Sequence, residues 1–204
     1  MGSGTRKIAG EPKNSLVYIN ACIRTNESRT LRIATPIVHA LCQRYEVDTI
    51  NLVNEPVPAL TVGSYRYRMS HGPTNIAEAQ ANMIVQAHRI VIAAPFWDMS
   101  FPANLKCFIE QVSLFNITFT DNGSTCVGLC KKPKVLFLTT RGMDISTGDK
   151  LEQATPYLKA IGKLWGLGKL TTIAAQNMDY STPEEVEAKI AACIAEGLDL
   201  AKTW

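Results

Sequence analysis

Long apolar runs are missing from this sequence of 204 residues, since none approaches the roughly 18 residues that a membrane span requires. The first 14 residues, MGSGTRKIAGEPKN, also lack the apolar stretch of a secretory signal. We predict a flexible lead-in over 1–14, whose MGSG start is typical of a tag remnant. The remaining residues, 15–204, are expected to form one soluble domain in the cytoplasm, with no membrane partner.

Pairs of the C-x-x-C type are absent among the six cysteines. Cys126 and Cys130 are four residues apart, but no second Cys/His pair lies nearby, so no zinc or other metal site is expected. A strong excess of charge is missing as well, because the net charge is +3. The one tight basic cluster, CKKPK at 130–134, is interpreted as a solvated turn before a strand and not as a nucleic-acid patch.

Motifs of side-chain catalysis are also absent: there is no H-E-x-x-H, no G-x-S-x-G and no pair of carboxylates at catalytic spacing. The three histidines are scattered. His39 and His88 fall in predicted helices and are interpreted as surface or packed residues, whereas the role of His71, in a predicted loop, stays open. This lack of catalytic groups is consistent with chemistry performed by a bound cofactor.

Five apolar runs alternate with helical patterns along the chain. The predicted strands are 15–20, 47–53, 89–95, 134–140 and 170–176, and the predicted helices are 28–45, 76–88, 102–115, 149–166 and 181–204. The Pro- and Gly-rich segment 54–75 is predicted to be a loop. Because the strands are apolar along their length, they indicate a parallel sheet covered by helices on both faces. The count predicts an α/β, doubly wound, flavodoxin-like sheet of order 2-1-3-4-5.

The loop after the first strand, NACIRTNES at 20–28, contains no glycine. It therefore matches neither G-x-G-x-x-G nor G-x-x-x-x-G-K-[ST], the loops that cradle nucleotide phosphates. It does lead into a helix start, where free N–H groups favour an anion, and Ser28 and Thr30 add hydroxyls. Two interpretations remain open: a shallow cup for a terminal phosphate monoester, or Ser28 as a plain helix cap.

The loop after the third strand, 95–102, carries large apolar residues where a solvent-facing loop is expected. They are Phe96, Trp97, Met99 and Phe101. Such residues at the ligand edge of a sheet indicate a flat, apolar ligand, and the alternative is packing against a neighbouring subunit.

The loop after the fourth strand, 140–149, offers Gly142 for close approach to a ring, and Arg141 as either a site residue or a solvated one. Aromatic walls, a phosphate cup and this glycine together fit a planar ring on a ribityl phosphate. FMN is such a ligand.

Three runs resemble FMN-dependent NADH-azoreductases and the related NAD(P)H:quinone oxidoreductases. They are VIAAPFWDMSFPANLKCFIEQV followed by ITFTDNG, then GLCKKPKVLFLTTRG, then TPYLKAIGKLWGL, and the resemblance spans about 15–200. It implies a homodimeric flavodoxin-like enzyme. Such an enzyme takes hydride from NADH or NADPH onto FMN and passes it, in a ping-pong cycle, to a quinone, azo or nitro compound.

Residue by residue, the resemblance places the family's phosphate loop on Cys22, Ser28, Arg29 and Thr30. Its ring-binding segments fall on Phe96, Trp97, Asp98 and Met99, and on Thr140, Arg141, Gly142 and Met143. Its substrate pocket falls on Phe119, Leu164 and Trp165, with a hairpin shorter than the family's.

Several positions depart from the family: its first loop serine falls on Cys22, its hairpin tyrosine has no counterpart, and its partner-helix phenylalanine falls near Leu164. Asp98 replaces a neutral asparagine, and its charge would lower the potential of the flavin. Met143 replaces a glycine, which narrows the site.

Two other classes are weighed against this enzyme. Flavodoxins, which carry single electrons, are usually strongly acidic and lack the hairpin, so a chain of net charge +3 argues against that class. A flavin-free binding or regulatory module is the third possibility, and the colour of the purified protein separates it from the other two.

Overall fold

The structure is a computed structural model that describes residues 14–204. The main strands are β1 (Asn14–Asn20), β2 (Tyr45–Asn51), β3 (Arg89–Ala93), β6 (Lys134–Thr140) and β7 (Leu170–Ala175). The helices are α1 (Arg29–Leu41), α2 (Val62–His71), α3 (Asn75–Gln86), α4 (Ala103–Val112), α5 (Ala154–Trp165) and α6 (Pro183–Thr203), with a short 3-10 turn η1 (Thr25–Glu27). Of the predicted lead-in, only Asn14 lies within the described residues, and it begins β1.

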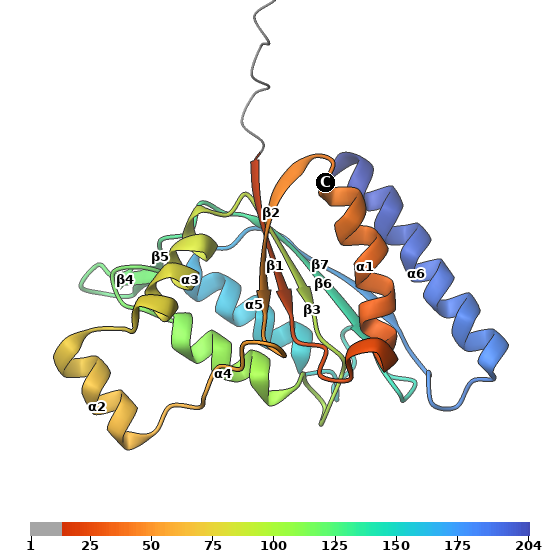
Figure 1. Cartoon of the computed structure of the whole chain (residues 1–204), viewed down its shortest axis with the longest axis horizontal. Coiled ribbons are helices and arrows are strands. Elements are labelled where there is room, and N and C mark those ends of the chain that lie inside the picture. Colours follow the sequence, from red (N-terminus) through yellow and green to blue (C-terminus); the bar gives the residue numbers. More distant parts are fainter. Residues whose placement is uncertain (1–13) are drawn as a thin grey trace, which may run out of the picture.

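The five main strands are parallel and hydrogen-bonded in the order β2-β1-β3-β6-β7. Renumbered as main strands only, this is the predicted order 2-1-3-4-5, which is confirmed. In Figure 1, α1 and α6 cover one face of the sheet, and α3, α4 and α5 cover the other. Each face has its own apolar cluster, because successive strand residues point to opposite sides: Val17 and Ile19 belong to one cluster, Leu16 and Tyr18 to the other.

At the amino end of the sheet, two aromatic rings pack around one guanidinium group. Trp204 lies against the start of β2, and its carbonyl accepts a hydrogen bond of 2.7 Å from the Tyr45 hydroxyl. The Arg89 guanidinium lies 5.7 Å from the centre of the Tyr45 ring and 5.6 Å from that of Trp204. Both rings are buried, so the starts of β2 and β3 are covered by apolar packing and cation–π contacts.

The segment 54–75 is not only a loop, because it contains α2. Thr61 and Ser64 cap the helix reciprocally, and Gly72, with φ of 85°, ends it. None of its ten residues is buried. The prediction of a loop was wrong because α2 has no apolar face directed at this chain's core, and hydrophobic periodicity detects only helices that have one.

A short antiparallel hairpin, β4 (Phe119–Asp121) and β5 (Cys126–Gly128), lies between α4 and β6. Its base docks on the end of α5: a Cβ atom added to Gly128 would lie 2.0 Å from the backbone nitrogen of Gly166. Gly166 is itself left-handed, with φ of 78°, and ends α5. Glycine is therefore required on both sides of this contact.

The prediction that His88 lies in a helix was wrong. His88 follows the end of α3 and is not in a helix, and its Nδ1 lies 3.1 Å from the Ser15 hydroxyl. Within 14–204, no helix is long and apolar enough to cross a membrane. The cytoplasmic location and the single-domain organisation stay predictions.

Candidate functional site

A hollow lies at the carboxyl end of the sheet, where the loops after β1, β3, β6 and β7 meet; we call it the edge hollow. Six of the residues predicted for the site line it: Ser28, Arg29, Phe96, Trp97, Thr140 and Gly142. Four others that sequence reasoning missed line it as well: Arg24, Glu27, Pro95 and Asp179. The sheet topology thus brings distant segments to one place, as expected for a doubly wound sheet.

Ser28 is the N-cap of α1, and its Oγ accepts a hydrogen bond of 3.2 Å from the Leu31 N–H. Of the two interpretations of Ser28, the helix cap is therefore observed. It does not exclude an anion, because the Ser28 hydroxyl still has a proton to donate while it accepts from Leu31; in the free protein that proton goes to the Cys22 sulfur, and an entering anion would take it over. The first turn of α1 also retains N–H groups that have no partner inside the helix.

Thr30 is fully buried, and its Oγ1 lies 2.7 Å from Oγ1 of Thr140. This bond joins the start of α1 to the end of β6, across 110 residues of sequence. The Thr30 side chain thus links α1 to β6 behind the edge hollow. It does not line the hollow, so a ligand bound there would not contact it.

Cys22 is also buried and lies off the edge hollow, with its Sγ 3.5 Å from the carbonyl oxygen of Ala93. Burial raises the pKa of this thiol to about 11, against the lowering effect of its hydrogen bond with Ser28. The thiol is therefore neutral at physiological pH and adds no negative charge beside an anion.

The loop after β3 makes a tight two-residue turn at Asp98 and Met99. Trp97 and Ser100 exchange backbone hydrogen bonds of 3.1 and 2.8 Å, and the two central residues have φ of 48° and 64°. Both are in the left-handed region, as in a type I′ turn, which is costly for a methionine. The turn leaves Trp97 38% exposed as a residue, next to the buried Phe96, while Asp98 and Met99 do not line the hollow.

Arg141 is fully buried, so the possibility that it is solvated was wrong. Its guanidinium donates to the Ile145 carbonyl at 2.8 Å and to the Thr147 hydroxyl at 2.9 Å. It also lies 3.9 Å from the buried Glu152 carboxylate and 5.7 Å from the centre of the Phe96 ring. Burial lowers the pKa of this guanidinium, and the Glu152 carboxylate opposes that shift. The hydrogen bonds to Ile145 and Thr147 and the ion pair with Glu152 tie the loop after β6 together beside the Phe96 ring.

Gly142 lies against the side chain of Asp179. A Cβ atom at this position would lie 2.0 Å from Oδ2 of Asp179, so glycine makes room for that carboxylate. Met143, the next residue, is 38% exposed, does not line the hollow, and accepts a hydrogen bond of 2.9 Å from the Asn177 N–H.

Comparison with known proteins agrees with this architecture. The model of the family described as "Flavodoxin-like fold" matches residues 14–199. This chain belongs to that family.

The curated relatives of this flavodoxin-like chain are oxidoreductases. FMN-dependent NADH:quinone oxidoreductase 2 of Clostridium acetobutylicum is 29% identical over 200 residues, covering 94% of this chain and 100% of the relative. FMN-dependent NADH:quinone oxidoreductase of Staphylococcus haemolyticus is 30% identical over 172 residues, covering 78% and 82%. Among solved structures, an azoreductase from Bacillus anthracis superposes with a TM-score of 0.80 at 18% identity, covering 94% of this chain and 100% of that one. The predicted resemblance is confirmed.

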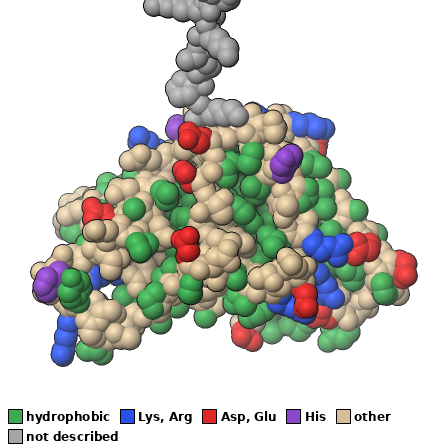
Figure 2. Space-filling view, in the orientation of Figure 1, with side chains coloured by type: hydrophobic (Ala, Val, Ile, Leu, Met, Phe, Trp, Pro, Cys, Tyr) green, Lys and Arg blue, Asp and Glu red, His purple; other side chains and the backbone are tan. Residues whose placement is uncertain are grey.

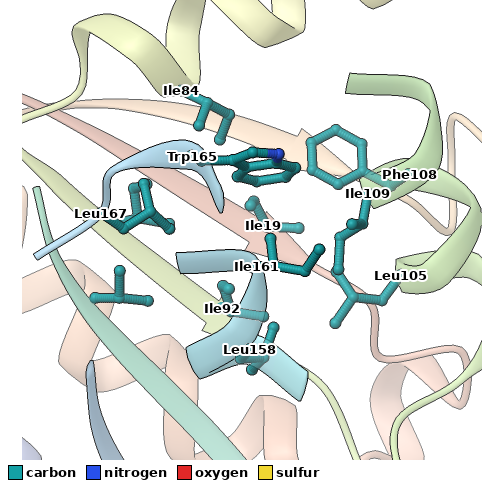
Figure 3. A pocket seen from close by; sticks show the side chains of 12 residues that line it. Ile19, Ile84, Ile92, Leu105, Phe108, Ile109, Leu158, Ile161, Trp165 and Leu167 are labelled. Carbon is teal, nitrogen blue, oxygen red and sulfur yellow. The ribbon is translucent and has the colours of Figure 1, made fainter. Parts of the chain in front are cut away.

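The predicted substrate pocket is not part of the edge hollow of this flavodoxin-like chain. Trp165 is buried, and its indole N–H donates to the Ser113 hydroxyl at 3.2 Å. Figure 3 shows this indole among apolar side chains of β1, β3, α3 and α4, which makes it a core residue. Leu164 packs against the same cluster, and Phe119 stacks edge-on with Phe115 at 5.9 Å.

Among residues 14–204, no three His, Cys, Asp or Glu side chains are grouped so as to hold a metal ion.

Proposed function

We propose that this chain is an FMN-dependent NADH:quinone oxidoreductase that also accepts azo compounds. The observation that carries the proposal is the edge hollow, which combines a capped, glycine-free helix start with a half-exposed indole. When bound, FMN supplies the hydride chemistry between NADH and the acceptor. The residues of the chain bind and orient it, which agrees with the lack of a catalytic side-chain motif.

The residues of the edge hollow fit the two halves of FMN. Ser28, the first turn of α1 and the guanidinium groups of Arg24 and Arg29 suit a terminal phosphate, which needs donors and positive charge. Phe96 and the exposed face of Trp97 suit a flat ring. A pyrophosphate fits less well, because a close approach of backbone to two phosphates requires glycines that this loop lacks.

We also propose that two copies of the chain form a homodimer through α2. Four large apolar residues of this helix are more than half exposed: Val62, Tyr65, Tyr67 and Met69. Figure 2 shows hydrophobic side chains at its lower left, where α2 lies. A helix that buries none of its residues gains little stability from packing within its own chain. Packing against a second copy of the chain would bury its apolar residues. Sedimentation of wild type and of a Tyr65→Glu/Met69→Glu variant tests this: the variant is expected to be monomeric.

The test of function begins with the colour of the purified protein. We expect a flavin absorbance spectrum, or uptake of added FMN, followed by bleaching when NADH is added without oxygen. NADPH, added to a second sample, tests the choice of nicotinamide. A colourless protein that takes up no FMN would overturn the proposal and favour a flavin-free module.

Steady-state kinetics then separate an enzyme from a single-electron carrier. A quinone and an azo dye should each sustain oxidation of NADH, and double-reciprocal plots at several acceptor concentrations should be parallel if NAD⁺ leaves before the acceptor binds. Bleaching by NADH without turnover on either acceptor would favour the carrier.

A further inference from the structure

We propose that Asp179 acts as an internal anion of the edge hollow. In the free protein it holds the Arg29 guanidinium, and an entering phosphate monoester must compete with it. Asp179 would thereby set how tightly the phosphate end of a flavin nucleotide is held. This inference rests on the proposed function, and the experiment below tests the two separately.

The contact between the two residues is direct. Arg29 Nη1 donates to Asp179 Oδ1 at 2.7 Å, although the residues are 150 positions apart in sequence. Both line the edge hollow. Their side chains are 37% and 64% exposed, so the ion pair lies at the mouth of the hollow, where a dissolved anion can reach it.

The position of Asp179 is set by more than this ion pair. Its backbone N–H donates to the Gly142 carbonyl at 3.0 Å, and the N–H of Met178 donates to the Arg141 carbonyl at 3.0 Å. Its Oδ2 occupies the space that a Cβ atom at Gly142 would fill. The backbone of Asp179 is thus held in the wall of the hollow by two loops, so a phosphate that displaces the carboxylate from Arg29 still has that carboxylate as a neighbour.

The charges of the edge hollow make the consequence clear. Arg24 pairs with Glu27 at 3.3 Å, and Arg29 pairs with Asp179, so two cations and two anions line the hollow and their formal charges cancel. A phosphate monoester brings up to two negative charges and can accept both N–H groups of one guanidinium edge. It therefore gains Arg29 as a partner, but only by breaking an existing pair and approaching a second negative charge, the Asp179 carboxylate.

The test compares FMN with riboflavin, which differ only in the phosphate. Flavin-free wild type and Asp179→Asn are titrated with each ligand, and binding is followed by the change in flavin fluorescence. The amide keeps the shape of the carboxylate but not its charge. We expect Asp179→Asn to bind FMN about three- to fivefold more tightly, the upper part of the range for an exposed ion pair. Riboflavin affinity should change by less than about twofold.

The matched control is the other long-range ion pair of α1. Arg32 contacts Glu187 of α6 at 3.0 and 2.5 Å, and neither residue lines the edge hollow. Glu187→Gln removes an arginine partner from the same helix and should leave both affinities unchanged. A thermal unfolding curve for each variant verifies that it is folded.

Two outcomes would overturn the inference. Unchanged FMN affinity in Asp179→Asn would show no competition, and weaker FMN binding would show that Asp179 orients Arg29 for the phosphate. If wild type binds no flavin, the proposed function fails instead. The competition can then be measured with inorganic phosphate, followed by phosphorus NMR, which Asp179→Asn should bind more tightly than wild type.

Discussion

The two ends of the parallel sheet are built in different ways. At the amino end, the rings of Tyr45 and Trp204 lie against the Arg89 guanidinium, and both rings are buried. At the carboxyl end, a buried ion pair of Arg141 and Glu152 supports loops that leave other groups exposed. The charge at the amino end is thus covered by aromatic rings, whereas the carboxyl end keeps charged groups and left-handed backbone around a hollow. Substitutions at the two ends should therefore affect stability and ligand binding in different proportions.

The largest effect is expected from Arg141→Met. The substitution leaves the Glu152 carboxylate buried without its cation and removes the support of Phe96. Loss of one partner of a buried pair costs about 3–5 kcal/mol in the free energy of unfolding, which urea denaturation measures. FMN affinity should fall as well. Arg32→Met, which breaks an exposed pair, is the control with a much smaller loss; equal losses in the two variants would contradict a special role of Arg141.

The second effect is expected from Trp204→Ala at the amino end. Removal of a buried tryptophan side chain costs about 3 kcal/mol of unfolding free energy. Because the cluster lies at the opposite end of the sheet, the variant should bind FMN as wild type does, at a temperature where both are folded. A parallel loss of FMN affinity would mean that packing at the amino end is coupled to ligand binding at the carboxyl end.

The third effect is a dependence of stability on pH that comes from Cys22, at the carboxyl end of the sheet. Burial raises the pKa of Cys22 from 9.0 to about 11, whereas the thiol of the unfolded chain ionises near its ordinary value. Stability from this group is therefore fully present below pH 9 and is lost as pH rises toward 11, by about 2–3 kcal/mol. Denaturation curves across this range should show a smaller alkaline loss in Cys22→Ala than in wild type. Identical slopes would place the thiol in contact with solvent.

The smallest effect concerns Asp98. Asparagine tolerates the left-handed φ of 48° as aspartate does, so Asp98→Asn changes charge and not the turn. Removal of a negative charge near the flavin should raise the midpoint potential of bound FMN. The change corresponds to a free energy on the order of 0.5 kcal/mol, the scale for an exposed charge. Spectroelectrochemical titration measures it, and an unchanged potential would place Asp98 too far from the ring to matter.

Sequence patterns were sufficient for the sheet and for the start of α1. Strands that are apolar along their length have one simple explanation, a sheet covered on both faces, and Ser28 before a helical pattern predicts the cap that is observed. By contrast, α2 was missed because its apolar residues face away from this chain's core.

The charged groups of the site could not be predicted in the same way. Arg141 follows a strand, where arginine is usually solvated, and its burial depends on Glu152, eleven positions along the chain (152 − 141). Asp179 lies after β7, and only the folded sheet brings it to Arg29 and Gly142. Local patterns carry no information on pairs formed across such distances.

The contact between Gly128 and Gly166 has a consequence for engineering. Backbone meets backbone there with no side chain between, so the base of the hairpin is anchored independently of its tip. Extra residues inserted between Asp121 and Cys126 would lengthen only an exposed turn, at a modest cost in chain entropy. The tip is thus a place where new recognition segments can be grafted without rebuilding the domain beneath it.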